Sequence, residues 1–336
     1  MSSDDERDDV ADGQGRGPEP DDTDEIDGDS VGSNRTAIAL FITTCITTFL
    51  AGALMAGDFD VAGGFAFSAT IMAILLAHEL GHYVVARRHG VATSLPYFIP
   101  LPPFISLGTM GAVIRMREPI RDRNKLLDVA VGGPLAGMVV AVPLLIIGLQ
   151  LSDVGPVTGG VTEGNSLLYA LIKYLVHGAW LPGGGVDVQL HPMGFAAWVG
   201  FLITMINLIP IGQLDGGHVA KAVFGDSHEG VSKWLHRALV FIGVSVVGWA
   251  FLDARPHMPD SEALTYGLGV GLPWLVWALL LSVLKRLSGG EYHPEVDPAP
   301  LSPSRRRLVV LIAIVFVAIF TPVPLRENLV LLLEAM

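Results

Sequence analysis

Three ionisable side chains stand within five residues in the stretch "HELGH". His78 and His82 are four residues apart, and Glu79 follows the first of them. On a helix, positions i and i+4 share a face, so both imidazoles can reach one metal ion while the carboxylate projects beside it. Zinc takes such imidazoles, and a neighbouring carboxylate can accept a proton from water and pass it to a leaving amine. The spacing predicts one zinc site per chain, with Glu79 as the catalytic base.

The motif lies in an apolar run, residues 62 to 87, that leads into Arg87 and Arg88. A carboxylate at mid-helix in lipid costs about 2.5 kcal/mol or more. Three ionisable groups without a partner or a function are therefore a poor explanation of this pattern. A pair of buried structural histidines is the less favoured alternative. At 1.5 Å per residue, His82 and His78 lie roughly 8 and 14 Å below the interface that the arginines mark. We expect a site inside the bilayer that is reached from the cytoplasmic side.

A further ligand is expected from "NLIPIGQLDGGH", which ends a later apolar run. Asp215 stands there near the same face of the membrane, so the topology brings its carboxylate to the metal. Pro210 and the pair Gly216 and Gly217 are expected to end the helix and turn the carboxylate inward. His218 is a competing ligand that we favour less.

Composition bounds the class of protein. Of 336 residues, 51% are hydrophobic and 16% charged, and the mean hydropathy is +0.53. Such a chain is too apolar for a solvated globular protein. We expect an all-α polytopic membrane protein with about six to seven transmembrane helices, surrounded by the lipid bilayer and without a nucleic-acid partner; its oligomeric state is left open. The candidate spans lie near residues 37–56, 62–87, 126–150, 192–213, 236–253, 264–284 and 307–324.

Charge divides the chain further. Residues 1–36 hold thirteen acidic residues against three arginines, which predicts a disordered tail. Clusters of Arg and Lys fall on one side if the runs alternate, so we expect a multi-pass protein of the cell membrane with a cytoplasmic N-terminus. The expected divisions are the tail 1–36, a first span 37–61, a catalytic membrane core 62–225 and C-terminal spans 226–336.

The segment between the second and third spans alternates like a strand. Met110, Ala112, Ile114 and Met116 would face one way and the residues between them the other. We predict a re-entrant or interfacial β-hairpin, which must lie against protein or line a wet cavity. Its exposed edge could pair with an unwound substrate, or the hairpin could be structural cover. The predicted substrate-binding residues are Gly108, Thr109, Met110 and Gly111.

These motifs carry a family resemblance. "HELGH" in an early span and "NLIPIGQLDGGH" in a later one, with "GGPLAG" (132–137) between them, resemble the site-2 proteases, which are intramembrane zinc metalloproteases. The resemblance implies His78, His82 and Asp215 as zinc ligands and Glu79 as the base. It implies that Asn207 steadies the oxyanion or holds substrate backbone. The chain looks most like the branch that includes plastid members, and "GGPLAG" is interpreted chiefly as a helix-packing motif.

By this resemblance the activity is regulated intramembrane proteolysis, with single-span membrane proteins as substrates. The loop 151–191 and the segment between the last spans are too short for a PDZ domain, and no CBS extension is expected. Two alternatives remain: a membrane zinc protease with a solvated catalytic chamber, and a metal transporter or zinc-binding scaffold that would still work after Glu79→Gln. The remaining histidines, including His228 and His293, are interpreted as ordinary surface residues.

Overall fold

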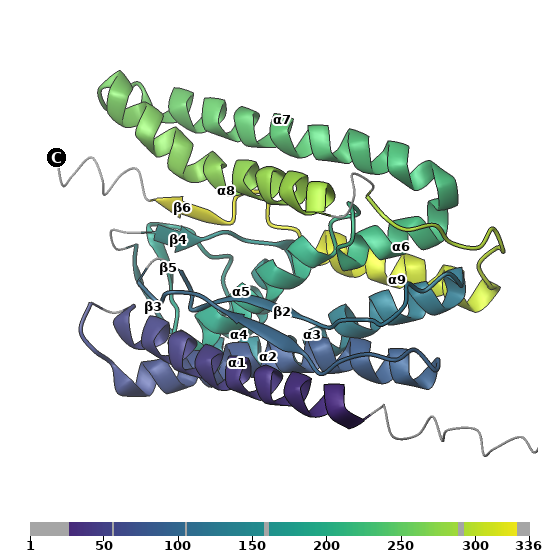
Figure 1. The fold of residues 1–336 in the computed structure, drawn as a ribbon. Helices are drawn as coiled ribbons and strands as arrows, with labels where there is room; N and C mark the ends of the chain where they lie inside the picture. Colours follow the sequence, from purple (N-terminus) through teal and green to yellow (C-terminus); the bar gives the residue numbers. More distant parts are fainter. Residues whose placement is uncertain (1–26, 56, 105, 158–160, 288–291, 328–336) are drawn as a thin grey trace, which may run out of the picture.

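The computed structural model describes residues 27–55, 57–104, 106–157, 161–287 and 292–327. It is mostly helical, with three small two-stranded sheets (Figure 1). The α-helices are α1 (Asp27–Leu54), α2 (Val61–Arg88), α3 (Arg123–Gln150), α4 (Leu167–His177), α5 (Pro192–Asn207), α6 (Asp215–Phe224), α7 (His228–Ala254), α8 (Asp260–Leu287) and α9 (Pro303–Ile319). The strands are β1 (Tyr97–Pro100), β2 (Thr109–Val113), β3 (Asp153–Pro156), β4 (Val161–Glu163), β5 (Val186–Gln189) and β6 (Leu325–Glu327).

The chain is a multi-pass membrane protein, as predicted. Of the expected six to seven spans, the upper value is too high. Five helical segments among the described residues are long and apolar enough to cross a bilayer: 34–54, 61–88, 123–150, 215–254 and 260–283. Helix α5 has only 16 residues and α9 only 17. At 1.5 Å per residue these reach about 24 and 26 Å, short of a core about 30 Å thick. The structure therefore supports roughly five to six spans.

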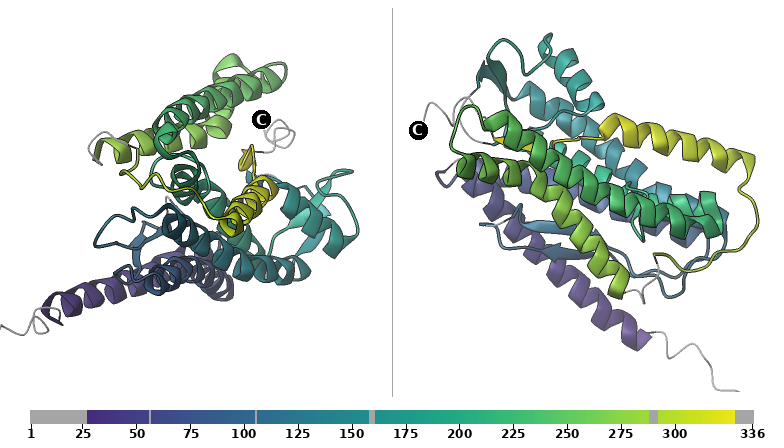
Figure 2. Two further views of the ribbon diagram at one scale, coloured as in Figure 1. Left: turned by 90° about the vertical axis from the view of Figure 1, so that its right-hand side faces the viewer. Right: turned by 90° about the horizontal axis from the view of Figure 1, so that it is seen from above.

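The helices form two groups. Helices α1, α2 and α3 lie along one side of the molecule, and α7 with α8 lies along the opposite side, with α5, α6 and α9 between them (Figure 1). The left view of Figure 2 shows the same separation. The start of α9 meets the end of α2 and the start of α3 through Asp128, whose carboxylate accepts hydrogen bonds from Arg305 and contacts His89. These basic chain segments thus lie at one end of the molecule, as the charge pattern predicted.

The first helix starts earlier than expected. The predicted disordered tail ran to residue 36, whereas α1 begins at Asp27. Residues 1–26 of that tail lie outside the described residues.

The predicted hairpin is present between α2 and α3. Strands β1 and β2 pair antiparallel, and the register shifts where Met110 and Gly111 together face Ile99. Gly111 has a φ of +107°, a backbone conformation that favours glycine. The bulge reverses the alternation: Thr109 is buried and Met110 is exposed, so Met110 does not share a face with Ala112 as predicted.

The hairpin is fastened to the first helix. The hydroxyl of Thr47 donates to the carbonyl of Gly108 over 2.6 Å. A Cβ atom on Gly108 would lie 2.5 Å from the Thr47 backbone. Glycine at this position therefore lets the hairpin approach α1.

In the loop 151–191, β3 pairs with β5, whereas β4 pairs with β6 from the C-terminal part of the chain. Helix α4 has 11 residues, about 17 Å at 1.5 Å per residue, which is too short to span. Lys173 in α4 is fully buried, and its Nζ lies 3.3 Å from an Asp187 oxygen and 3.8 Å from a Glu163 oxygen. The hydroxyl of Tyr169 donates to Glu163 over 2.8 Å, so the buried charges are partnered.

Candidate active site

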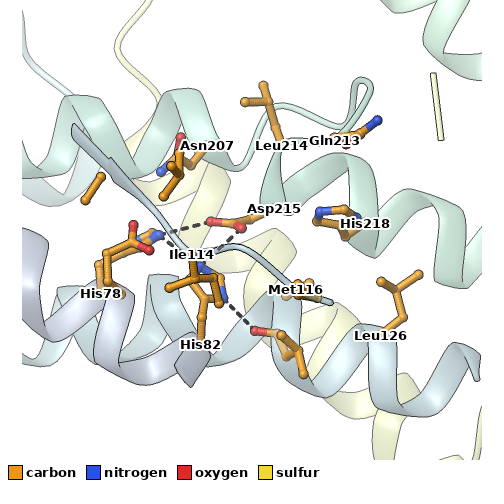
Figure 3. Close-up of a pocket in the computed structure, with 15 residues that line it drawn as sticks. His78, His82, Ile114, Met116, Leu126, Asn207, Gln213, Leu214, Asp215 and His218 are labelled. Carbon is orange, nitrogen blue, oxygen red and sulfur yellow. Dashed lines mark hydrogen bonds and ion pairs between the residues drawn. The ribbon is translucent and has the colours of Figure 1, made fainter. Parts of the chain in front are cut away.

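The HELGH residues lie on the inner face of α2, as predicted. His78, Glu79 and His82 are exposed by only 4%, 5% and 6%. The helix is continuous from Val61 to Arg88, so the i, i+4 spacing places both imidazoles on one face. Figure 3 shows them pointing toward Asp215.

Asp215 reaches the site because the helical structure is interrupted just before it. Helix α5 ends at Asn207, and α6 begins with Asp215 itself after a turn. A Cβ on Gly216 would lie 2.0 Å from the carbonyl oxygen of Leu208, and one on Gly217 would lie 2.2 Å from that of Gly212. The prediction that these glycines end the helix is wrong, because they lie in the first turn of α6. Their lack of a side chain lets α6 pack against the backbone of residues 208–212.

The ligand atoms of the three residues converge. His78 Nε2 lies 3.1 Å from one Asp215 oxygen, and His82 Nε2 lies 3.2 Å from the other. The two Nε2 atoms are 3.1 Å apart, and the three ligand atoms fall within 4.8 Å of one another. Two imidazole nitrogens and a carboxylate in this arrangement form a donor set that zinc prefers, and three protein ligands leave a tetrahedral position for water or substrate. The donor chemistry therefore fits zinc.

A backbone carbonyl orients one of these imidazoles. His82 Nδ1 donates to the carbonyl oxygen of Val129 in α3 over 2.8 Å. The hydrogen on Nδ1 leaves Nε2 unprotonated and available for a metal. Sequence reasoning missed this partner because any residue type supplies a carbonyl.

The glycines of GGPLAG make room for the site. A Cβ on Gly81 would lie 2.4 Å from the carbonyl oxygen of Gly132, so α2 and α3 approach closely there. A Cβ on Gly133 would lie 2.1 Å from His82 Nε2. The packing interpretation is confirmed, and the group packed against Gly133 is the imidazole of the metal site.

These residues line a pocket of about 180 Å³, which is large enough for several water molecules. Its walls come from α2, α3, the hairpin and the turn between α5 and α6 (Figure 3). The lining residues are His78, Glu79, His82, Ala112, Val113, Ile114, Met116, Leu126, Val129, Ala130, Asn207, Gln213, Leu214, Asp215 and His218. Asn207 thus faces the same pocket as Glu79, as the resemblance implied.

The hairpin contributes later residues than those predicted. Ala112 to Ile114 and Met116 line the pocket, whereas Gly108, Thr109, Met110 and Gly111 are not among its lining residues. The Thr109 hydroxyl instead bonds within the hairpin, accepting from Gly111 N over 3.0 Å. A substrate contact by residues 108–111 stays a prediction.

Two other histidines differ from expectation. His228 and His293 are exposed by only 1% and 8%, so their interpretation as surface residues is wrong. His218 lies 2.6 Å from His293, measured from Nδ1 to Nε2, and does not belong to the three-residue metal group. Sequence reasoning missed the cluster because His293 lies 75 residues beyond His218.

Comparison with known proteins agrees with this geometry. The profile described as "Peptidase family M50" matches residues 66–248. "Probable zinc metalloprotease EGY1, chloroplastic" of Arabidopsis thaliana is 31% identical over 215 residues, covering 62% of this chain and 35% of the relative. "Probable zinc metalloprotease EGY2, chloroplastic" of Oryza sativa subsp. indica is 34% identical over 226 residues, covering 62% and 40%.

A third relative extends the match. "Probable zinc metallopeptidase EGY3, chloroplastic" of Arabidopsis thaliana is 26% identical over 304 residues, covering 77% of this chain and 51% of the relative. The chain thus spans about a third to a half of the length of these relatives. No solved structure matches.

Proposed function

Because the chain belongs to peptidase family M50, a family of zinc metalloproteases, we propose that it hydrolyses peptide bonds of single-span membrane proteins within the bilayer. The observation that carries the proposal is the convergence of His78, His82 and Asp215 beside Glu79 in one pocket. His78, Glu79 and His82 are positioned by α2, an apolar helix long enough to cross a membrane. Ionisable groups within a membrane-spanning helix are costly, so their presence indicates a functional site.

His78, His82 and Asp215 would hold the zinc ion. A zinc ion bound there supplies a Lewis acid that polarises a carbonyl and lowers the pKa of water. The hydrogen bond from His82 to Val129 fixes the ring that presents Nε2 to the ion. The short distances between the donor atoms support this assignment.

Glu79 would move the proton. Its carboxylate accepts a proton from the attacking water as the water oxygen bonds to the scissile carbonyl carbon. When the carbon–nitrogen bond breaks, Glu79 delivers that proton to the departing amine. The side-chain amide of Asn207, on the facing wall of the pocket, donates a hydrogen bond to the oxyanion between these steps.

The setting defines the class of substrate. The residues that line the pocket come from apolar helices and from the hairpin, so we expect a substrate segment to enter from the membrane and to expose its backbone by unwinding. We assign the chain to the cell membrane with its N-terminus in the cytoplasm, since the basic residues Arg87 and Arg88 end α2, on the side where α1 begins if α1 and α2 both cross the membrane. Regulated cleavage of a single-span protein is the role that fits this placement.

Cleavage and metal content test the proposal together. The unmutated chain, Glu79→Gln and Asp215→Ala are purified in detergent and incubated with a panel of single-span proteins. We expect the unmutated chain to bind one zinc ion and cleave. Glu79→Gln should keep zinc and lose activity by 10²-fold or more, in the range of general acid–base catalysis, about 10² to 10⁴. Asp215→Ala should lose both zinc and activity.

The variants separate the alternatives. Cleavage by Glu79→Gln at the unmutated rate would exclude Glu79 as the base. Zinc binding by Asp215→Ala at the unmutated level would remove Asp215 from the ligand set. Zinc transport into liposomes that survives Glu79→Gln, without cleavage of any substrate in the panel, would favour a transporter.

A further inference from the structure

A second pair of histidines adjoins the metal site. His218 lies three residues after Asp215 on α6 and lines the same pocket. Figure 3 places its ring next to Asp215. Its partner, His293, belongs to the segment between α8 and α9 and lies outside the residues that match the family profile. The C-terminal part of the chain therefore reaches the wall of the pocket.

Hydrogen bonds assign the protons of this pair. His293 Nδ1 lies 2.8 Å from the carbonyl oxygen of Pro294, which can only accept, so Nδ1 carries the hydrogen. In a neutral ring His293 Nε2 is then an acceptor, and His218 Nδ1 donates to it over 2.6 Å. Burial lowers the pKa of His293 below its ordinary value, which favours the neutral ring. The tautomer of His218 that results leaves Nε2 unprotonated.

The segment that carries His293 is held firmly. The backbone N–H of Tyr292 donates to Glu229 over 3.2 Å, and the Tyr292 hydroxyl is 3.0 Å from His236 Nδ1. The His293 ring contacts His218 edge-on, with ring centroids 4.8 Å apart. A ring fixed on several sides can hold a second ring in one orientation.

An acceptor at this place meets a need of the substrate. A peptide that unwinds in the pocket exposes backbone N–H groups that have lost their helical partners. An unpaired N–H group in an apolar site is costly, so the enzyme must offer acceptors. Among the residues lining the pocket, Glu79 and the metal ligands are committed to chemistry, whereas His218 Nε2 has no hydrogen-bond partner among the described residues.

We propose that His218 accepts a hydrogen bond from a backbone N–H of the bound peptide, and that His293 is the positioning residue that holds it in that orientation. This inference deepens the proposed function and rests on it. His218 would belong to the substrate-binding machinery and act through Nε2. His293 touches no substrate and acts through the ring of His218.

Peptide binding tests the pair without relying on turnover. A fluorescent single-span peptide that the unmutated chain cleaves is titrated against Glu79→Gln protein in detergent, and zinc content is measured for each variant. In that background, His218→Leu should weaken binding about tenfold with zinc retained, the loss expected for one buried hydrogen bond. His293→Leu should weaken binding several-fold. His293→Gln should restore most of it, since its amide oxygen can accept from His218 Nδ1.

A cycle and a control distinguish positioning from stability. The double variant His218→Leu with His293→Leu should bind no more weakly than His218→Leu alone, because His293 acts only through His218. His228→Leu is the matched control: its ring is buried, with its centroid 5.7 Å from that of His293, but it does not line the pocket. It should bind within twofold of the background.

Several outcomes overturn the inference while leaving the proposed function intact. Binding by His218→Leu within twofold of the background would exclude the contact. Loss of zinc in that variant would give His218 a role at the metal instead. Additive losses in the double variant, or equal losses for His228→Leu and His293→Leu, would show that His293 acts only through general stability. Failure of the proposed function would be seen separately, as cleavage by the Glu79→Gln protein itself.

Discussion

Two helix pairs of this molecule approach closely at glycines, and only one of them carries chemistry. Between α2 and α3, Gly81 faces the Gly132 backbone and Gly133 faces the imidazole of His82. Between α7 and α8, a Cβ on Gly243 would lie 2.6 Å from Leu275 Cδ2, and one on Gly267 would lie 2.7 Å from the carbonyl oxygen of Val247. Small residues let helices approach in both pairs. The difference lies in what fills the space.

The two helix pairs also differ in how much of their surface is buried. The apolar window of α2 is 56% buried, against 22% for the window in segment 215–254, which ends with α7. Helix α7 leaves large apolar side chains exposed, such as Phe241 at 73%, as expected for a surface that faces lipid. A metal site needs a fully enclosed face, because its ligands must be oriented by neighbours. Close packing of two helices is therefore not sufficient. Helix α2 also packs against α1 and α5, whereas the described part of the chain leaves one face of α7 exposed.

The largest expected effect comes from adding a single methyl group at Gly133, between α2 and α3. In Gly133→Ala the added Cβ, built 2.1 Å from His82 Nε2, must displace the ring from the metal position. We expect zinc content to fall at least tenfold and cleavage at least 10²-fold, since one of three protein ligands is moved. Zinc analysis and cleavage of a single-span substrate measure both effects.

Gly243→Ala is the matched control in the other helix pair. Its Cβ meets the end of the flexible Leu275 side chain, so the cost should appear as reduced thermal stability with zinc content unchanged. If both alanine variants keep zinc and activity, the role assigned to Gly133 is wrong. If both lose zinc, the distinction between the helix pairs fails.

The buried Lys173 cluster tests whether burial of charge by itself creates function. Lys173→Met leaves Asp187 and Glu163 without their cation in an enclosed site. Removing one partner of a buried pair costs about 3 kcal/mol or more. We expect a clear fall in the thermal unfolding temperature, while the protein that remains folded keeps its full zinc content. A loss of zinc with no change in unfolding temperature would contradict this structural role.

The smallest effect should come from the pH dependence of the same cluster. Burial raises the pKa of Glu163 above its ordinary value, and Lys173 only partly opposes this. The folded chain therefore binds the Glu163 proton more tightly than the unfolded chain does. The contribution of Glu163 to stability falls as the pH rises from its ordinary pKa toward its folded value.

Glu163→Gln should flatten that part of the stability profile, because the amide does not titrate yet can still accept from Tyr169. Thermal unfolding in detergent from pH 4.5 upward measures it, with the exposed Glu262→Gln as the control. An unchanged slope in Glu163→Gln would assign the pH dependence to other groups.

Local periodicity predicted much of the site. The spacing of His78 and His82 fixes their common face on any helix, and Glu79 lies beside them for the same reason. The apolar length of α2 predicted its membrane setting, and strand alternation predicted the hairpin. The position of Asp215 near His78 and His82 followed from the order and orientation of the apolar runs. Each of these features depends on residues close together in the sequence or on the order of the apolar runs.

Other features were wrong or missed because they depend on contacts between distant segments. The bulge at Gly111 reverses the facing of Met110, and no residue pattern specified that extra residue. The end of the helix near Pro210 was predicted, but the place of Gly216 and Gly217 in the first turn of α6 became visible only from the carbonyl groups that they approach. The upper value of the expected span count, seven, was too high because hydropathy does not show where an apolar helix stops.

The sequence by itself determined which groups could do the chemistry: two imidazoles and a carboxylate at helical spacing in an apolar run, and an aspartate after a later one. Tertiary structure alone decided how these groups are held. The carbonyl of Val129 orients His82, Gly133 leaves space for its ring, and His293 reaches His218 from another part of the chain. Side-chain identity is local and legible in a sequence, whereas a backbone acceptor, an absent Cβ and a distant partner acquire meaning only when packing brings them together.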